Sequence, residues 1–380
     1  MISGIEIFSG AGGLATGLGL AGVSHNAFVE WNCDACRTLR MNYDSDIVFE
    51  GDIRNFDFTS YRGIDIIAGG PPCQPFSLGG KAKGNLDERD MFPSAIRSIR
   101  ELQPKVFLFE NVKGLLRTNF KGYLDYILLQ LSFPTITQSS DCLNHINKIK
   151  QSATDVPLHE QYDVYINLVN AADYGVPQKR ERVIIVGVRK DLHIEWNLPT
   201  PTHSLDALLW SKYVTKEYWE KHSILPSNSE YNTFARNKSY LEYKYGFFPP
   251  ESLPWLTVRD ALVDLPKEGD LTFYPSEHVV RSGAKEYYGH SGSPIDEPAK
   301  TIKAGAHGVP GGENMIKYPD GSVRYFTVFE AKRIQTFPDD YQIIGSWTES
   351  MRQLGNAVPV RLAQIISSSI IDMLNNEKFS

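Results

Sequence analysis

The sequence has few cysteines, no long apolar run and no basic leader, and each of these features excludes a class of protein. Only four of its 380 residues are cysteines, whereas small secreted domains depend on dense disulfide frameworks. No apolar run approaches the roughly 20 residues that a transmembrane helix needs, and the start lacks the segments of a secretory signal. We therefore expect a cytoplasmic protein without membrane association.

Positive charge is not in excess either. The formal net charge is −6 at pH 7, which argues against a nonspecific nucleic-acid coat protein, because such proteins are usually basic. It does not exclude an enzyme that binds nucleic acid through a local positive surface. The candidate for that surface is the cluster Lys179, Arg180, Arg182, Arg189 and Lys190.

Two of the four cysteines, Cys33 and Cys36, form a CxxC pattern. A structural zinc site needs two further ligands, and neither His25 nor Cys142 has a suitable spacing. We therefore expect these cysteines to lie on a helix surface or in the core, and we expect no bound metal.

Short apolar runs alternate with segments long enough to be helices. This alternation predicts an α/β fold, a doubly wound and mostly parallel sheet with helices on both faces. The length suggests either two domains or one large domain with an insertion. The runs expected to form strands are residues 5–8, 27–29, 47–49, 64–68, 106–109, 164–169 and 183–188.

The spacing of apolar residues predicts helices at 94–102, 123–131, 329–335 and 360–374. Residues 134–161 show little periodicity, and we expect a loop insertion there.

After about residue 195 the sequence becomes rich in proline and aromatic residues and has few periodic segments. We expect residues 1–195 to form a first domain and residues 196–320 a second, irregular one. Residues 321–380 would return to the first domain, and the last helix would pack against it.

A proline-rich loop, Gly69-Gly70-Pro71-Pro72-Cys73-Gln74-Pro75-Phe76-Ser77, follows the apolar run 64–68. The prolines fix φ at three positions and restrict the residues before them. Cys73 is thereby presented on a stiff loop, a setting that a core cysteine does not need. This setting predicts a nucleophile.

The loop 69–77 resembles the catalytic loop of DNA cytosine-5 methyltransferases. In that chemistry a thiolate adds to carbon 6 of cytosine, which makes carbon 5 able to accept a methyl group. The resemblance implies that Cys73 is the nucleophile and that Glu110, in Phe109-Glu110-Asn111-Val112, is the general acid at ring nitrogen 3. A carboxyl at the end of a strand can be partly desolvated, which favours its acid form.

Arg180 and Arg182 alternate just before the last apolar run, and they would point to the same side if the strand begins there. The resemblance implies that Arg182 hydrogen-bonds the carbonyl oxygen of cytosine, with Arg180 and Gln178 organising the site.

A glycine-rich segment follows the first apolar run, where glycine lets the backbone approach a nucleotide-like ligand. The residues concerned are Phe8, Gly10, Ala11, Gly12, Gly13 and Leu14. Glu30 ends the second run, from which an acid can bind a ribose diol. Trp31 can lie against an adenine face, and Asp52, beside Ile53, can accept from its amino group.

NAD and S-adenosylmethionine both suit such a crevice. The resemblance decides for S-adenosylmethionine, with S-adenosylhomocysteine as product. It also implies that Pro72, Met91, Asn356 and Val358 complete the pocket. Glu6 stands where the family usually has aspartate, a substitution that keeps the charge.

The resemblance implies a catalytic and cofactor-binding domain at 1–195, a target-recognition domain at 196–320, and methylation of a flipped-out cytosine in a specific double-stranded DNA sequence. It also implies a monomer in a restriction-modification system, with a cognate endonuclease that acts on the same site without a stable complex. An RNA cytosine-5 methyltransferase of the same fold, an NAD(P)-dependent oxidoreductase and a DNA-binding protein without turnover remain alternatives.

Overall fold

The computed structural model describes residues 1–72, 90–137, 141–265, 277–288, 290–304 and 314–376. The chain divides into two compact units. The first unit contains residues 1–169, 181–199 and 363–380, and the second contains 170–180 and 200–362.

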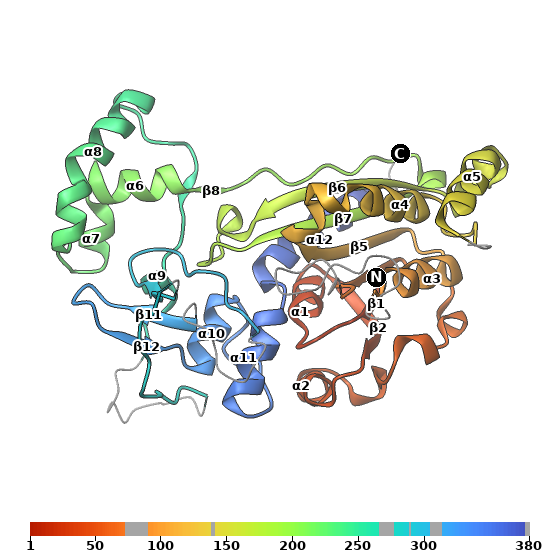
Figure 1. Ribbon diagram of the computed structural model, residues 1–380, viewed down its shortest axis with the longest axis horizontal. Helices are drawn as coiled ribbons and strands as arrows, with labels where there is room; N and C mark the ends of the chain where they lie inside the picture. Colours follow the sequence, from red (N-terminus) through yellow and green to blue (C-terminus); the bar gives the residue numbers. More distant parts are fainter. Residues whose placement is uncertain (73–89, 138–140, 266–276, 289, 305–313, 377–380) are drawn as a thin grey trace. The chain divides into compact units, whose positions relative to one another are not determined.

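A seven-stranded sheet forms the centre of the first unit (Figure 1). Its strand order is β3-β2-β1-β4-β5-β7-β6. The pairs from β3 through to β5 are parallel, and β7 runs antiparallel to β5. The strands are β1 (Ile2–Ile7), β2 (Val23–Glu30), β3 (Val48–Glu50), β4 (Ile66–Gly69), β5 (Val106–Val112), β6 (Tyr162–Asn170) and β7 (Glu181–Arg189). Each predicted run is confirmed as a strand, and the sheet is mostly parallel as predicted.

Helices cover both faces of this sheet, as the doubly wound pattern predicts. Side chains alternate along β2, so Ala27 and Val29 join the core cluster under α3 and α4, whereas Phe28 packs with residues of α1 and α2 on the other face. The helices are α1 (Gly13–Leu20), α2 (Cys33–Asn42), α3 (Phe92–Leu102), α4 (Lys121–Ser132) and α5 (Cys142–Ser152).

The two CxxC cysteines open α2 and have the expected locations. Cys33 is exposed on the helix surface and Cys36 is fully buried. Burial raises the pKa of the Cys36 thiol to about 12, so this thiol behaves as a core residue.

The prediction of a loop at 134–161 is wrong, because α5 lies within it. Asp141 caps this helix by accepting a hydrogen bond from Asn144 N at 2.9 Å. Only His145 and Ile149 of α5 are buried, and such a narrow apolar face leaves almost no periodic signal in the sequence.

The second unit combines short strands with helices and is more helical than the sequence predicts. Its helices are α6 (Leu205–Tyr213), α7 (Glu217–Lys221), α8 (Asn228–Tyr245), α9 (Val258–Ala261), α10 (Val328–Ile334) and α11 (Trp347–Asn356). Its strands are β8 (His203–Ser204), β9 (Leu253–Pro254), β10 (Ser293–Pro294), β11 (Met315–Lys317) and β12 (Val323–Tyr325).

The last helix, α12 (Val360–Asn376), begins in the second unit and continues into the first. With α11 it forms a stretch, Trp347–Asn376, that is long and apolar enough to cross a membrane by length and composition. However, 61% of its most apolar window is buried in the protein, as in an ordinary core helix.

Candidate active site

The backbone that leads to the predicted nucleophile is anchored at the carboxyl end of β4. A Cβ atom at Gly69 would lie 2.2 Å from the carbonyl oxygen of Ile7, so only glycine fits there. Asn111 Nδ2 donates to Pro71 O at 3.0 Å, and Asn111 Oδ1 accepts from Val112 N at 2.9 Å. Sequence reasoning gave Asn111 no role, although its position next to Glu110 was the available signal.

Cys73 itself lies in 73–89, outside the described residues. Of the two prolines before it, Pro71 is buried and Pro72 is exposed. The Asn111 bond therefore fixes the backbone two residues before the predicted nucleophile.

Glu110 lies in β5, the neighbour of β4, with 9% of its surface exposed. Since Gly69 pairs with Phe109, Glu110 is brought beside the start of the proline-rich loop. A Cβ atom at Gly70 would lie 3.5 Å from Glu110 Oε2. The carboxyl group therefore borders the backbone that carries Cys73.

Arg182 is the ionic partner of Glu110. Its Nε lies 2.6 Å from Glu110 Oε1, and each side chain is 11% exposed. This contact is an ion pair without a hydrogen bond, because Arg182 Nε has no hydrogen-bond partner among the described residues. Arg182 Nη1 donates to Glu181 O at 2.8 Å. The two groups thus form a nearly buried ion pair from adjacent strands.

Arg180 and Gln178 lie in the second unit and are buried at 1% and 0% exposure. Arg180 donates to the carbonyl oxygens of Ile302, Gly355 and Ala357 at 2.8–3.1 Å. Gln178 donates to Gln335 Oε1 and accepts from Ile302 N, both at 3.0 Å. Both side chains brace backbone segments of this unit.

The condition under which Arg180 and Arg182 would share one side of a strand is not met. The strand β7 begins at Glu181, so Arg180 precedes it. Arg180 is held by carbonyl groups of the second unit, and Arg182 is paired with Glu110 in the first.

The glycine-rich segment makes a tight turn between β1 and α1. Phe8, Gly10 and Gly12 have positive φ values of 55°, 54° and 81°, and a Cβ atom at Gly10 would meet no atom within 4 Å. The turn therefore leaves open space beside the backbone, as a nucleotide cradle requires. The other predicted members of the segment are Ala11 and Leu14, which are buried, and Gly13, which begins α1.

Glu30 ties this turn to the end of β2. Its Oε2 accepts from Gly10 N at 2.8 Å, and its Oε1 accepts from Trp31 N and Asn32 N at 2.9 and 2.8 Å. A carboxylate has about four acceptor sites, so the described residues occupy three of them and leave one, on Oε2. Glu30 can therefore still accept from a ribose hydroxyl.

Trp31 and Asp52 follow β2 and β3, which end at the same edge of the sheet as β1. Trp31 is 79% exposed, so its indole face is open to a ligand. The carboxylate of Asp52 is held by Arg54, with Nη2 2.5 Å from Oδ2. The hydrogen bonds from Arg54 lower the pKa of Asp52, and an adenine amino group would share this carboxylate with the arginine.

The remaining predicted pocket residues divide between the units. Ile53 is buried and Met91, directly before α3, is half-buried. Asn356 ends α11 with an exposed side chain, and Val358 is buried, but both belong to the second unit. The turn at Gly10 follows β1, and the buried carboxylate of Glu30 and the exposed indole of Trp31 lie at the end of β2. Together these groups fit a nucleoside.

Glu6, which stands where the family usually has aspartate, is deeply buried in β1. It is 1% exposed, and its Oε2 has no hydrogen-bond partner within the described residues. Burial, with a smaller effect from Glu30, raises the pKa of Glu6 well above its usual value. Glutamate at this position therefore places a buried carboxyl group with a raised pKa in β1.

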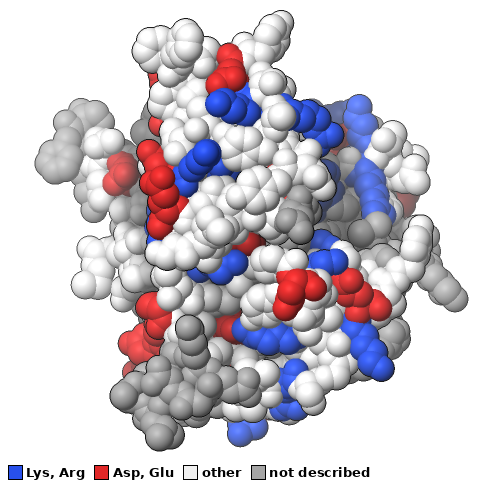
Figure 2. All heavy atoms as spheres, turned by 90° about the vertical axis from the view of Figure 1, so that its left-hand side faces the viewer, with Lys and Arg blue, Asp and Glu red and all other residues white. Residues whose placement is uncertain are grey.

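The predicted positive surface is not free. Lys179 pairs with Glu297, Arg189 with Asp191 and Lys190 with Asp163 at 3.1, 2.7 and 3.5 Å. Arg180 is buried and Arg182 pairs with Glu110. That prediction was wrong because a charge count along the sequence does not show the partners. Figure 2 shows positive and negative side chains interspersed over one face of the molecule.

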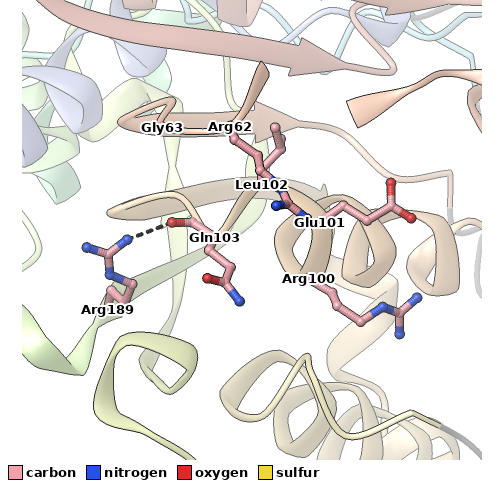
Figure 3. Close-up of a pocket in the computed structure, with 7 residues that line it drawn as sticks. All are labelled: Arg62, Gly63, Arg100, Glu101, Leu102, Gln103 and Arg189. Atoms are coloured by element: carbon pink, nitrogen blue, oxygen red, sulfur yellow. Dashed lines mark hydrogen bonds between the residues drawn. The ribbon is translucent and has the colours of Figure 1, made fainter. Parts of the chain in front are cut away.

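A pocket of about 360 Å³ lies at the opposite edge of the sheet, at the start of β4 and β5 and the end of β7. Figure 3 shows that its arginines do not converge, because Arg100 points away from Arg189. Arg189 Nη1 instead donates to Gln103 O at 2.7 Å. This pocket is separate from the crevice that holds Glu110.

The strand order, with β7 antiparallel to β5 in a sheet that is otherwise mostly parallel and has helices on both faces, is consistent with a class I S-adenosylmethionine-dependent methyltransferase fold. The chain also matches the family described as C-5 cytosine-specific DNA methylase over residues 2–134 and 137–372. It belongs to this family and is a DNA cytosine-5 methyltransferase. Membership implies S-adenosylmethionine as the methyl donor.

Curated relatives agree with this assignment. The chain is 33% identical over 379 residues to the Type II methyltransferase M.NgoFVII of Neisseria gonorrhoeae, covering 98% of this chain and 87% of that one. It is 34% identical over 376 residues to M.Eco47II of Escherichia coli, covering 98% and 79%. The crystal structure of the S. pombe Dnmt2 methyltransferase has the same fold, with a TM-score of 0.58 and 16% identity over 99% of each chain.

Proposed function

We propose that the protein methylates carbon 5 of a flipped-out cytosine in a specific double-stranded DNA sequence through a covalent adduct with Cys73. The observation that carries this proposal is the Glu110–Arg182 pair at 2.6 Å, beside the backbone that leads to Cys73. An acid and a cation at one point can engage nitrogen 3 and the carbonyl oxygen of the same base.

The protein groups have complementary tasks in this mechanism. The thiolate of Cys73 forms a bond to carbon 6 while nitrogen 3 takes a proton from Glu110, which first takes up that proton from solvent as the base separates it from Arg182, so that electron density collects at carbon 5. Arg182 holds the carbonyl oxygen, and Arg180 and Gln178 keep the surrounding backbone in place. S-adenosylmethionine supplies an electrophilic methyl group when bound. After methylation, water takes the proton from carbon 5, the bond from Cys73 to carbon 6 breaks with return of the thiolate, and nitrogen 3 gives its proton back to Glu110, which restores the ring.

The cofactor would lie at the carboxyl edge of β1, β2 and β3. The open space beside the backbone at Gly10 would leave room for the cofactor. Glu30 would accept a hydrogen bond from a ribose hydroxyl, and Trp31 would cover the adenine. The full predicted set is Phe8, Gly10, Ala11, Gly12, Gly13, Leu14, Glu30, Trp31, Asp52, Ile53, Pro72, Met91, Asn356 and Val358.

Two relatives carry the name Type II methyltransferase, which supports a role as the modification enzyme of a restriction-modification system. In that role the protein acts in the cytoplasm as a monomer on double-stranded DNA. A cognate endonuclease would recognise the same sequence without forming a stable complex with it. The residues that contact DNA would belong to the recognition interval 196–320.

Transfer of tritium from labelled S-adenosylmethionine tests the proposal and its RNA alternative together. Matched DNA and RNA duplexes of one sequence library are incubated with the protein, and label in 5-methylcytosine is counted. We expect label in DNA and none in RNA. Label confined to RNA, or no label on any cytosine-containing DNA, would overturn the proposal.

A further inference from the structure

The helix α8 has one face that is fixed to the second unit. Figure 1 shows α6, α7 and α8 as a group of three helices, with α6 in contact with both others. Glu230 accepts from Lys212 at 3.0 Å, the ring of Phe234 meets that of Tyr213 edge-on, and Leu241 is fully buried. We call this the inner face of α8.

The opposite face of α8 has no such contacts in the described part of the chain. Asn232, Arg236, Ser239 and Tyr243 are all exposed, Tyr243 by 91%. Their i, i+4, i+7 and i+11 spacing places them on one side of the helix. We call these four residues the outer face.

The outer face combines hydrogen-bonding groups with an available cation. Among the described residues Arg236 has no ion pair, and the outer face carries no carboxylate. The two acids of the helix lie elsewhere, since Glu230 is on the inner face and Glu242 pairs with Lys238 at 3.7 Å. A polyanion can therefore approach this face without meeting a negative group on it.

The dimensions of this face suit the DNA major groove, which is about 12 Å wide and admits an α-helix. At 1.5 Å per residue, Asn232 and Tyr243 are about 16 Å apart along the axis, comparable to a few base-pair steps. Arginine makes bidentate hydrogen bonds to guanine, and asparagine makes bidentate hydrogen bonds to adenine. Serine can hydrogen-bond either base. The side chains thus match the chemistry of base edges as well as their spacing.

We propose that α8 is a recognition helix whose outer face reads base pairs in the major groove, with Arg236 and Asn232 as specificity-determining residues. This inference rests on the proposed action on double-stranded DNA. A protein partner is the competing occupant, because Phe247 and Phe248 just beyond α8 are 98% and 80% exposed. DNA is favoured because the outer face itself offers arginine, asparagine and serine rather than an apolar surface.

Three variants separate base reading from general effects. Arg236→Ala and Asn232→Ala remove outer-face groups, and Lys238→Ala removes one positive charge from the side of the same helix. The site that the wild type methylates is first found by bisulfite sequencing of a methylated DNA library. Methylation rates are then measured on this site and on duplexes with each flanking base pair changed.

We expect Arg236→Ala to lower kcat/KM on the preferred site by about 10-fold or more and to relax discrimination at one flanking base pair. Asn232→Ala should relax a different pair, and Lys238→Ala should stay within about twofold of the wild type. S-adenosylmethionine binding should be unchanged in all three variants, because none of the three residues is in the predicted cofactor set.

Equal rates and equal discrimination in Arg236→Ala and Lys238→Ala, with an active wild type, would overturn the role of α8. A loss that is the same on every sequence would also overturn base reading, because it would indicate a phosphate contact. Unchanged methylation with altered self-association would assign the outer face to a protein partner instead. A wild type that methylates no DNA would reject the proposed function itself.

Discussion

Arg182 Nε lies 2.6 Å from Glu110 Oε1, and both side chains are almost removed from solvent. The pair joins two adjacent strands, β5 and β7, because Glu110 faces Ile184 and Val112 faces Arg182 in their register. Removing one partner of a nearly buried ion pair strongly destabilises the folded protein, because the other charge is left buried without a partner. The protein therefore keeps its predicted acid and its predicted oxyanion donor together before any base enters.

Arg182→Ala should lower the rate of methyl transfer by about 10²-fold or more, the usual scale for losing one donor to a developing oxyanion. Single-turnover methylation measures this directly, and DNA binding should persist. Lys113→Ala is the control, because Lys113 pairs with Glu181 nearby but both side chains are about half exposed. A variant Arg182→Ala that keeps more than half of the wild-type rate would remove arginine from the mechanism.

Asn111→Ala should slow methyl transfer by about 10-fold or more while leaving cofactor affinity unchanged, because it releases the carbonyl of Pro71. It should also lower the free energy of unfolding by about 1–3 kcal/mol, as for other lost buried hydrogen bonds. Asn42→Ala removes a comparable side-chain-to-backbone bond on α2, from Asn42 Nδ2 to Thr38 O. If both variants lose only stability, Asn111 has no positioning role.

Glu30→Gln should weaken S-adenosylmethionine binding by about 10-fold or more. In a glutamine one carboxylate oxygen is replaced by an NH₂ group, which cannot accept from Gly10 N or from Trp31 N and Asn32 N. Each buried N–H donor that loses its acceptor costs about 1–3 kcal/mol of stability. Isothermal titration with the cofactor and urea unfolding measure the two effects. Glu50→Gln at the end of β3 is the control, since its pair with Arg40 is exposed. An unchanged Kd for Glu30→Gln would place the ligand elsewhere.

Glu6 should make stability depend on pH. Its pKa is raised in the folded protein above the usual value of 4.5, so the folded state holds a proton that the unfolded chain loses above about pH 4.5. The free energy of unfolding therefore falls as pH rises from there toward the raised pKa. Glu6→Gln cannot ionise and should lose this component. Urea unfolding from pH 5 to 8 tests the difference, and identical pH slopes would show that Glu6 is charged in the folded state.

The sheet could be predicted from the sequence because its central strands β4, β5 and β7 are mostly buried and give apolar runs such as residues 106–109. The helix α8 could not, because Leu241 is its one fully buried residue among those whose burial is described, and the rest of its inner face is polar or aromatic. Where apolar residues do not repeat, helical periodicity has no signal to show.

The candidate site shows a similar division. Residues placed at strand ends, such as Glu30 and Glu110, could be predicted because parallel strands end at one edge of the sheet. Pairings across distant segments could not, and so the ion pairs of Lys179 with Glu297 and of Arg182 with Glu110, and the deep burial of Glu6, came only from the structure.

Capture of a covalent complex on fluorinated DNA tests the central claim most directly. Fluorine at carbon 5 cannot leave as a cation, so the bond from Cys73 to carbon 6 cannot be reversed after methyl transfer. A duplex with 5-fluorocytosine at the methylated position is incubated with the cofactor and analysed under denaturing conditions. We expect a protein–DNA adduct with the wild type and none with Cys73→Ser, because a hydroxyl is far less ionised than a thiol. No adduct with a wild type that methylates the unmodified site, or an adduct that persists in Cys73→Ser, would contradict the account.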